Sequence, residues 1–200
     1  MKQNFLLIFL ALSTLLTCKY ENKEGDKIEE KTFIKHAKGF DIQHFEHYSK
    51  LIIKSPYPNA KEFQEFYFIR DNDISLTRSE SDMVSKIPNQ KIIKDAISDV
   101  VVTSTTHIPM LELLDEETSL VGFPNLQYIS SEKTNKRIKE GKIRELGNEE
   151  SINTEVVLAL QPDAVIGFAL NSNNKMFTTI EKAGIPVLLN GDWLEETPLG

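Results

Sequence analysis

The sequence predicts an α/β fold in which a parallel sheet with flanking helices follows a small β extension. Three observations indicate this fold. From residue 99 onward, short apolar runs alternate with segments of helical character. Before residue 70, aromatic and β-branched residues gather in runs separated by a turn-prone stretch. The first 17 residues form a separate apolar segment, so they are expected to be a targeting signal and not part of the fold.

The parallel sheet is predicted from short apolar runs bounded by turn residues. These runs lie at residues 100–102, 120–122, 164–167 and 186–189. Helical segments alternate with them, at residues 109–114, 130–139, 153–160 and 174–183. Asn153 is a suitable N-cap and Gly184 a suitable C-terminal stop. Strands that alternate with helices run parallel, and ligands bind beyond their carboxyl ends.

The β extension is predicted from three runs rich in aromatic and branched residues. Two of them, Phe40–Ile42 and Leu51–Ile53, precede the turn-prone stretch Ser55–Asn59, and the third, Glu65–Ile69, follows it. This arrangement favours a hairpin or a small meander. Residues 71–95 are polar and show no clear pattern.

The N-terminus has the features of an export signal. Lys2 precedes a nearly unbroken apolar run of 12 residues, 5–16, which is shorter than the ~20 residues that a spanning helix needs. Residues Leu15 to Cys18 then resemble the lipobox of bacterial lipoproteins, and Cys18 is the single thiol available for lipidation. We therefore expect a lipoprotein signal peptide at residues 1–17, with a plain secretory signal and a chance cysteine as the alternative. Residues 18–38 carry mixed charges and are expected to be a solvated tether to a lobe at residues 39–200.

Composition and motifs narrow the function. A net charge of −7 argues against binding to nucleic acid. One cysteine excludes an internal disulfide and any zinc site with two cysteine ligands. The sequence has no phosphate-binding glycine loop, no nucleophile elbow and no HExxH motif. Ser104 and His107 are close in sequence, but no acidic partner can be named for a catalytic triad. These features favour a binding protein with no catalytic step over an enzyme.

The four histidines carry weak signals. His44 and His47 would share a face only in a helix, and they lie near predicted strands, so ordinary surface histidines are expected. His36 lies within the charged tether. His107 lies in a hydroxyl-rich loop at the mouth of a predicted helix, where capping of that loop and contact with a ligand remain equally open.

Four segments, in chain order, are similar to sequence motifs of one family. The most recognisable begins with Asn153 and Glu155, continues as a helix, and reaches Pro162-Asp163 before a strand. The complete set is residues 39–42 with 51–57, 100–111, 153–167 and 190–200. Together with the lipobox, these segments make the chain resemble the substrate-binding lipoproteins of the ABC importers for iron-siderophores, haem and cobalamin.

The resemblance implies a fold and partners. The family has two α/β lobes joined by a long helix, with the ligand in the cleft between them, so this chain is expected to be a Rossmann-like first lobe. The sequence stops inside a motif that normally leads into the connecting helix. A second lobe would need on the order of 100 more residues, so the sequence is expected to be part of a longer one. The implied partners are a metal complex, carried as ligand and not as cofactor, and an ABC permease with its ATPase.

The resemblance and the predicted strand ends together give a list of site residues. The expected ligand-binding residues are Ser104, Thr105, Thr106, His107, Phe123, Tyr128, Gly167, Phe168, Asn190 and Trp193. For the four aromatic residues the alternative is core packing, and about half are expected to be buried. The resemblance also implies that Glu155, on the surface, docks onto arginines of the permease.

Two other functions stay open from the sequence alone. Direct binding of a bare metal ion would need His107 and at least two more ligands at one place. A lipid-anchored hydrolase would need a nucleophile and a base within hydrogen-bond reach.

Overall fold

A computed structural model of the chain describes residues 30–31, 34–69, 78–94, 97–148 and 151–197. The expected signal peptide, Cys18 and most of the expected tether lie outside these residues. Within the described part, no helix has both the length and the apolar character needed to cross a membrane.

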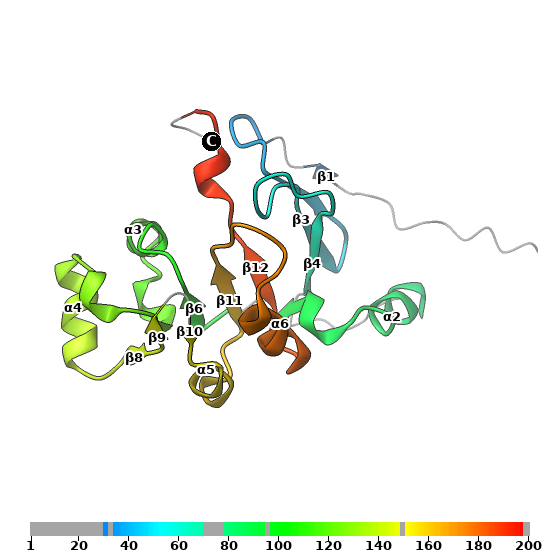
Figure 1. The fold of residues 1–200 in the computed structure, drawn as a ribbon. Coiled ribbons are helices and arrows are strands. Elements are labelled where there is room, and N and C mark those ends of the chain that lie inside the picture. The colour runs from blue at the N-terminus through cyan, green and yellow to red at the C-terminus, as the bar shows by residue number, and fades with distance from the viewer. Residues whose placement is uncertain (1–29, 32–33, 70–77, 95–96, 149–150, 198–200) are drawn as a thin grey trace, which may run out of the picture.

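A parallel sheet of five strands forms the centre of the fold (Figure 1). Its order is β12-β11-β6-β7-β8, and every neighbouring pair in it is parallel. The strands are β6 (Val100–Val102), β7 (Leu120–Phe123), β8 (Arg144–Glu145), β11 (Ala164–Gly167) and β12 (Val187–Leu189). The predicted α/β class and the four predicted strands of the sheet are confirmed.

Helices cover both faces of this sheet. On one face, α5 (Thr154–Leu160) and α6 (Lys175–Lys182) bury Val157, Phe177 and Ile180 against the strand residues Val101, Val165 and Val187. On the other, α3 (His107–Leu113) buries Ile108 in a second cluster. The amphipathic helix α4 (Glu132–Lys139) follows the short helical turns η3 (Glu117–Ser119) and η4 (Leu126–Tyr128).

Capping side chains and a glycine set the helix boundaries. The Asn153 side chain accepts hydrogen bonds from the N–H groups of Glu155 and Val156, as the sequence predicted, and Asn174 caps α6 in the same way. Gly184 follows the end of α6 with a φ of +91°, a conformation that favours glycine. Between β7 and α5, the short hairpin of β9 (Gly147–Asn148) and β10 (Ser151–Ile152) was not predicted.

The β extension is a second sheet, in the order β1-β2-β3-β4-β5. Three antiparallel strands, β2 (Phe40–His44), β3 (Tyr48–Ile53) and β4 (Gln64–Ile69), confirm the predicted meander. The short strand β1 (Glu30–Lys31) pairs with β2 at one edge. The unpredicted part beyond β4 contains α2 (Arg78–Val84), the turn η2 (Asn89–Lys91) and β5 (Ile92–Lys94), which pairs in parallel with β4.

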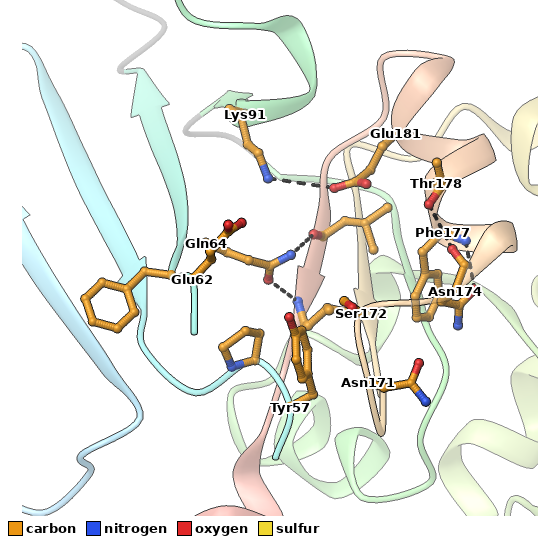
Figure 2. A pocket seen from close by; sticks show the side chains of 14 residues that line it. Tyr57, Glu62, Gln64, Lys91, Asn171, Ser172, Asn174, Phe177, Thr178 and Glu181 are labelled. Carbon is orange, nitrogen blue, oxygen red and sulfur yellow. Dashed lines mark hydrogen bonds and ion pairs between the residues drawn. The ribbon is translucent and has the colours of Figure 1, made fainter. Parts of the chain in front are cut away.

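The two sheets are joined at β12. Gln64 bonds to the β12 backbone as another strand would: its Nε2 donates to the Val187 carbonyl at 3.4 Å, and its Oε1 accepts from the Leu189 N–H at 2.9 Å (Figure 2). Leu188 packs from β12 against the core of the extension, which contains Ile53, Phe66 and Ile93. A polar hollow of about 340 Å³ lies beside this junction, where Lys91 pairs with Glu181 at 3.7 Å. The extension therefore has a fixed position along the edge of the parallel sheet.

Candidate functional site

The carboxyl ends of three neighbouring strands are tied together. The Thr103 N–H, just after β6, donates to the Ile166 carbonyl at 3.1 Å, and the Thr103 hydroxyl accepts from the Phe168 N–H at 3.0 Å. The Asn190 N–H, just after β12, donates to the Gly167 carbonyl at 2.9 Å. The loops that follow β6, β11 and β12 therefore meet at one edge of the sheet, where α/β proteins bind ligands.

His107 is a buried part of this edge. Only 3% of its surface is exposed, and its Nε2 lies 3.2 Å from Asn190 Nδ2. With the amide nitrogen donating, Nε2 accepts and the ring proton lies on Nδ1, a buried atom that has no hydrogen-bond partner among the described residues. The Asn190 side chain also accepts from the Asp192 N–H at 3.1 Å, so the imidazole supports the turn η5 (Asp192–Leu194). Of the two roles open from the sequence, the structure favours support of the loops.

The environment of His107 disfavours the charged form of the imidazole. Burial lowers the pKa of His107 below its ordinary value of 6.5, and the nearby Asp192 carboxylate opposes this shift only in part.

The hydroxyl-rich loop lies at the surface of the same edge. Thr105 and Thr106 are exposed and Ser104 is half-buried. The Ser104 and Thr106 hydroxyl oxygens lie 2.9 Å apart, and Ser104 Oγ accepts from the Thr106 N–H at 3.3 Å. The Thr106 side chain makes no capping hydrogen bond to α3. The hydroxyls of Thr105 and Thr106 therefore remain at the surface.

Two aromatic rings flank the loop ends. Phe168 follows β11 and is 37% exposed, and Trp193 lies on η5 and is 48% exposed. Their ring centroids are 6.0 Å apart with the planes tilted by 54°. Tilted aromatic pairs at this separation attract one another, so the two rings form one apolar surface.

Three expected site residues add no side chain to the surface that these loops and rings form. Phe123 is fully buried in the core with Val100 and Leu120, so its expected contact with a ligand is corrected to core packing. Gly167 is buried, and a Cβ added there would lie 2.6 Å from Phe177 Cζ, which makes glycine a requirement of packing. Tyr128 is 63% exposed, but it lies on η4, beyond β7. One of the four aromatic residues is thus buried, fewer than the expected half.

Thr103 and Asp192 contribute to the site but were not singled out from the sequence. Thr103 is 5% exposed, and its hydroxyl positions Phe168, while Asp192 begins the turn that carries Trp193. Thr103 directly follows the predicted strand at residues 100–102, and Asp192 comes shortly after the predicted strand at residues 186–189. A search for polar residues at every strand end would have found both.

The structure does not bring the histidines together. His44 lies in β2 with its Nδ1 2.9 Å from Ser49 Oγ, and His47 lies beside Glu46 in the turn before β3. The helix that would put His44 and His47 on one face is absent there. Within the described residues, no three His, Cys, Asp or Glu side chains are grouped so that they could hold a metal ion.

The α/β part is similar to known proteins. Residues 100–193, from β6 to η5, match the model of a family described as periplasmic binding protein. An uncharacterized lipoprotein of Methanocaldococcus jannaschii is 22% identical over 179 residues, which are 84% of this chain and 43% of that protein. The chain therefore spans less than half the length of this curated relative. A solved periplasmic heme binding protein from Pseudomonas aeruginosa is 23% identical, with a TM-score of 0.38 over 46% of this chain and 30% of that one.

The buried imidazole predicts a pH-dependent stability. Between pH 7.5 and 5.5 the unfolded chain binds a proton at His107 near the ordinary pKa of 6.5, whereas the folded chain binds it only at lower pH. The free energy of unfolding should therefore fall as the pH falls, by at most about 1.4 kcal/mol per pH unit from this group. Denaturant unfolding at both pH values should show a smaller fall for His107→Gln than for the unchanged chain or for the control His36→Gln. An equal fall in all three proteins would show that His107 does not cause it.

Proposed function

We propose that this chain, whose residues 100–193 match the model of the periplasmic binding protein family, captures a metal complex outside the cytoplasm and delivers it to an ABC importer. The family match covers every strand of the parallel sheet and all the loops that meet at its carboxyl edge. The proposed role consists of binding and release, with no catalytic step.

The proposed class of ligand rests on the side chains at the carboxyl edge of the sheet. The exposed rings of Phe168 and Trp193 lie at the same edge of the sheet as the half-buried hydroxyl of Ser104 and the exposed Thr105 and Thr106. Apolar rings offer contact area to a large flat or conjugated group, and hydroxyls offer hydrogen bonds to oxygen atoms around it. This combination suits an iron-siderophore, a haem or a cobalamin-type complex better than a bare ion, which would need several charged ligands at one place.

Loss of the aromatic surface should weaken the binding of the complex. In the full-length protein, Phe168→Ala with Trp193→Ala should lower the affinity for the bound complex at least tenfold, roughly 1.4 kcal/mol. The melting temperature should change little, because both rings are partly exposed. Isothermal titration with a panel of ferric siderophores, haem and cobalamin measures the effect.

Phe63→Ala is the control for this pair, because Phe63 is a 61% exposed ring that precedes β4 in the extension. It should leave every affinity unchanged. If the double variant binds each complex as tightly as the control does, the ligand does not lie on these rings.

Glu155 is proposed to dock onto the permease. Its side chain is exposed in the first turn of α5, and the Glu155 N–H is satisfied by the Asn153 cap. A carboxylate in this turn also stabilises the helix by about 0.3–1 kcal/mol through the helix dipole. Both roles are compatible, because docking uses the exposed carboxylate and the dipole acts along the helix.

Neutralising this carboxylate should reduce the uptake of the complex without changing its binding. Glu155→Gln in the full-length protein should reduce transport in cells while the affinity for the complex stays unchanged. The matched control is Glu132→Gln, since Glu132 is an exposed acid in the first turn of α4. A parallel loss of affinity and transport, or an equal effect of the control, would contradict a docking role.

Attachment to the outer face of a membrane is proposed through a lipid on Cys18. The lipobox-like residues 15–18 support this attachment, and so does the description of the archaeal relative as a lipoprotein. Cys18→Ala should move the protein from the membrane fraction to the soluble extracytoplasmic fraction, and mass spectrometry of the unchanged protein should show a lipidated Cys18. An unmodified cysteine in a protein that stays with the membrane would exclude this anchor.

A further inference from the structure

An apolar cavity of about 350 Å³ lies between the β extension and the parallel sheet. It is distinct from the polar hollow of Figure 2, which lies around Gln64 and α6. The extension lines it from one side, and α3 and the last two strands line it from the other. Its main apolar side chains are Phe40, Leu51, Ile53, Met110, Ile166 and Leu188.

Backbone contacts hold the two walls of this cavity in place. The Glu195 carboxylate, just after η5, accepts from the Lys38 N–H at 2.9 and 3.0 Å and from the Gly39 N–H at 2.7 Å. At Gly191 the backbones approach so closely that an added Cβ would collide with the Ser55 carbonyl oxygen. Gln64 fixes β4 to β12 on a third side. The two walls cannot approach each other and close the cavity without breaking these contacts. The cavity is therefore a fixed feature of the fold.

The size of the cavity indicates the size of an occupant. Protein interiors contain few voids larger than a water molecule, and an engineered apolar cavity of about 150 Å³ binds benzene. Natural ligand sites begin at about 300 Å³ and are mostly apolar, with a few polar groups that set the orientation of the ligand. A cavity of 350 Å³ is therefore large enough for a ligand whose apolar part consists of about two fused rings.

The charges at the rim indicate the polar end of the occupant. Asp192 and Glu195 line the cavity, and Glu196 follows them in the chain. The Lys38 ammonium pairs with Glu196 at 2.8 Å, so this pair adds no net charge, and both charged residues that line the cavity are acidic. A net negative rim attracts a cation and repels a carboxylate.

We propose that this cavity is a binding site for a small apolar molecule that carries an amine. The ring system would lie between the walls formed by Leu51 and Leu188, with the amine toward Asp192. The site adjoins the loop that carries Trp193, because Asn190 and Asp192 line it, but neither Phe168 nor Trp193 does, and it does not depend on the proposed capture of a metal complex.

The test uses the position of Met110 in the cavity wall. The full chain carrying Cys18→Ala, which has no lipid to compete, is labelled with ¹³C at the methionine methyl groups and titrated with 1-naphthylmethylamine. The Met110 methyl resonance should shift and saturate, while the resonance of Met176, a residue of α6 that packs against the core, should stay in place. 1-Naphthoate, with a related ring and the opposite charge, should bind at least tenfold more weakly.

Filling the cavity should abolish this binding. Ala37→Trp at the rim should weaken the binding of 1-naphthylmethylamine at least tenfold, and Leu51→Phe in β3 provides a second filling variant if Ala37→Trp does not fold. Leu113→Trp is the control, because Leu113 lies on α3 one turn from Met110, does not line the cavity and is 85% exposed. It should change the affinity less than twofold.

Three results would overturn the proposal. A Met110 resonance that does not shift to saturation excludes the site, and unchanged binding by the filling variants places the probe elsewhere. Equal affinity for 1-naphthoate contradicts the preference for an amine. Titration of the metal complexes is a separate measurement, so failure here does not decide the proposed capture function.

Discussion

A buried hydroxyl and a buried imidazole hold the carboxyl edge of the parallel sheet together. Burial of a polar group is costly unless it is hydrogen-bonded, so the Thr103 hydroxyl and His107 Nε2 favour the arrangement in which each has a partner. Thr103 fixes the backbone of Phe168 through its hydroxyl, and His107 fixes the Asn190 side chain, which in turn holds η5. The positions of both exposed rings therefore depend on two residues that are themselves buried.

The opposite edge of the sheet is fixed by a carboxylate. Asp163 accepts from the N–H groups of Ser98 and Asp99 at 2.8 and 3.0 Å, and its own N–H donates to the Asp99 carbonyl. Burial alone would raise the pKa of Asp163, but these hydrogen bonds outweigh it and bring the pKa below its ordinary value. The Pro-Asp pair seen in the sequence thus aligns the starts of β6 and β11, so that their ends meet at the same level.

The α/β lobe could be predicted from the sequence because its signals are local. Val100 to Val102 form a continuous apolar run because the strand is buried on both faces, and Asn153 begins its helix with a cap that acts within three residues. β8, β9 and β10 have two residues each, too few to show any periodicity. β5 was missed because its pairing with β4 depends on a partner far away in the chain.

The site was harder to predict because burial is decided by distant residues. His107 meets Asn190 across 83 positions of the chain, so the sequence could not choose between support and ligand contact. Phe123 ends its strand like Gly167 does, yet its side chain turns into the core. The surface hydroxyls and the exposed rings of Phe168 and Trp193 agree with the predicted positions at the strand ends, and whether they bind a ligand remains the central proposal.

Trp193 gives the most direct measurement of that proposal, because it is the single tryptophan of the chain. Haem, cobalamin and many ferric siderophores absorb where tryptophan emits, so a complex bound against this ring quenches its fluorescence. Titration of the full-length protein with each complex, corrected for absorption by the free complex, should give strong and saturable quenching for one class. Emission that stays unchanged at a concentration where titration calorimetry shows the complex to be bound would place the ligand away from these loops and contradict the account.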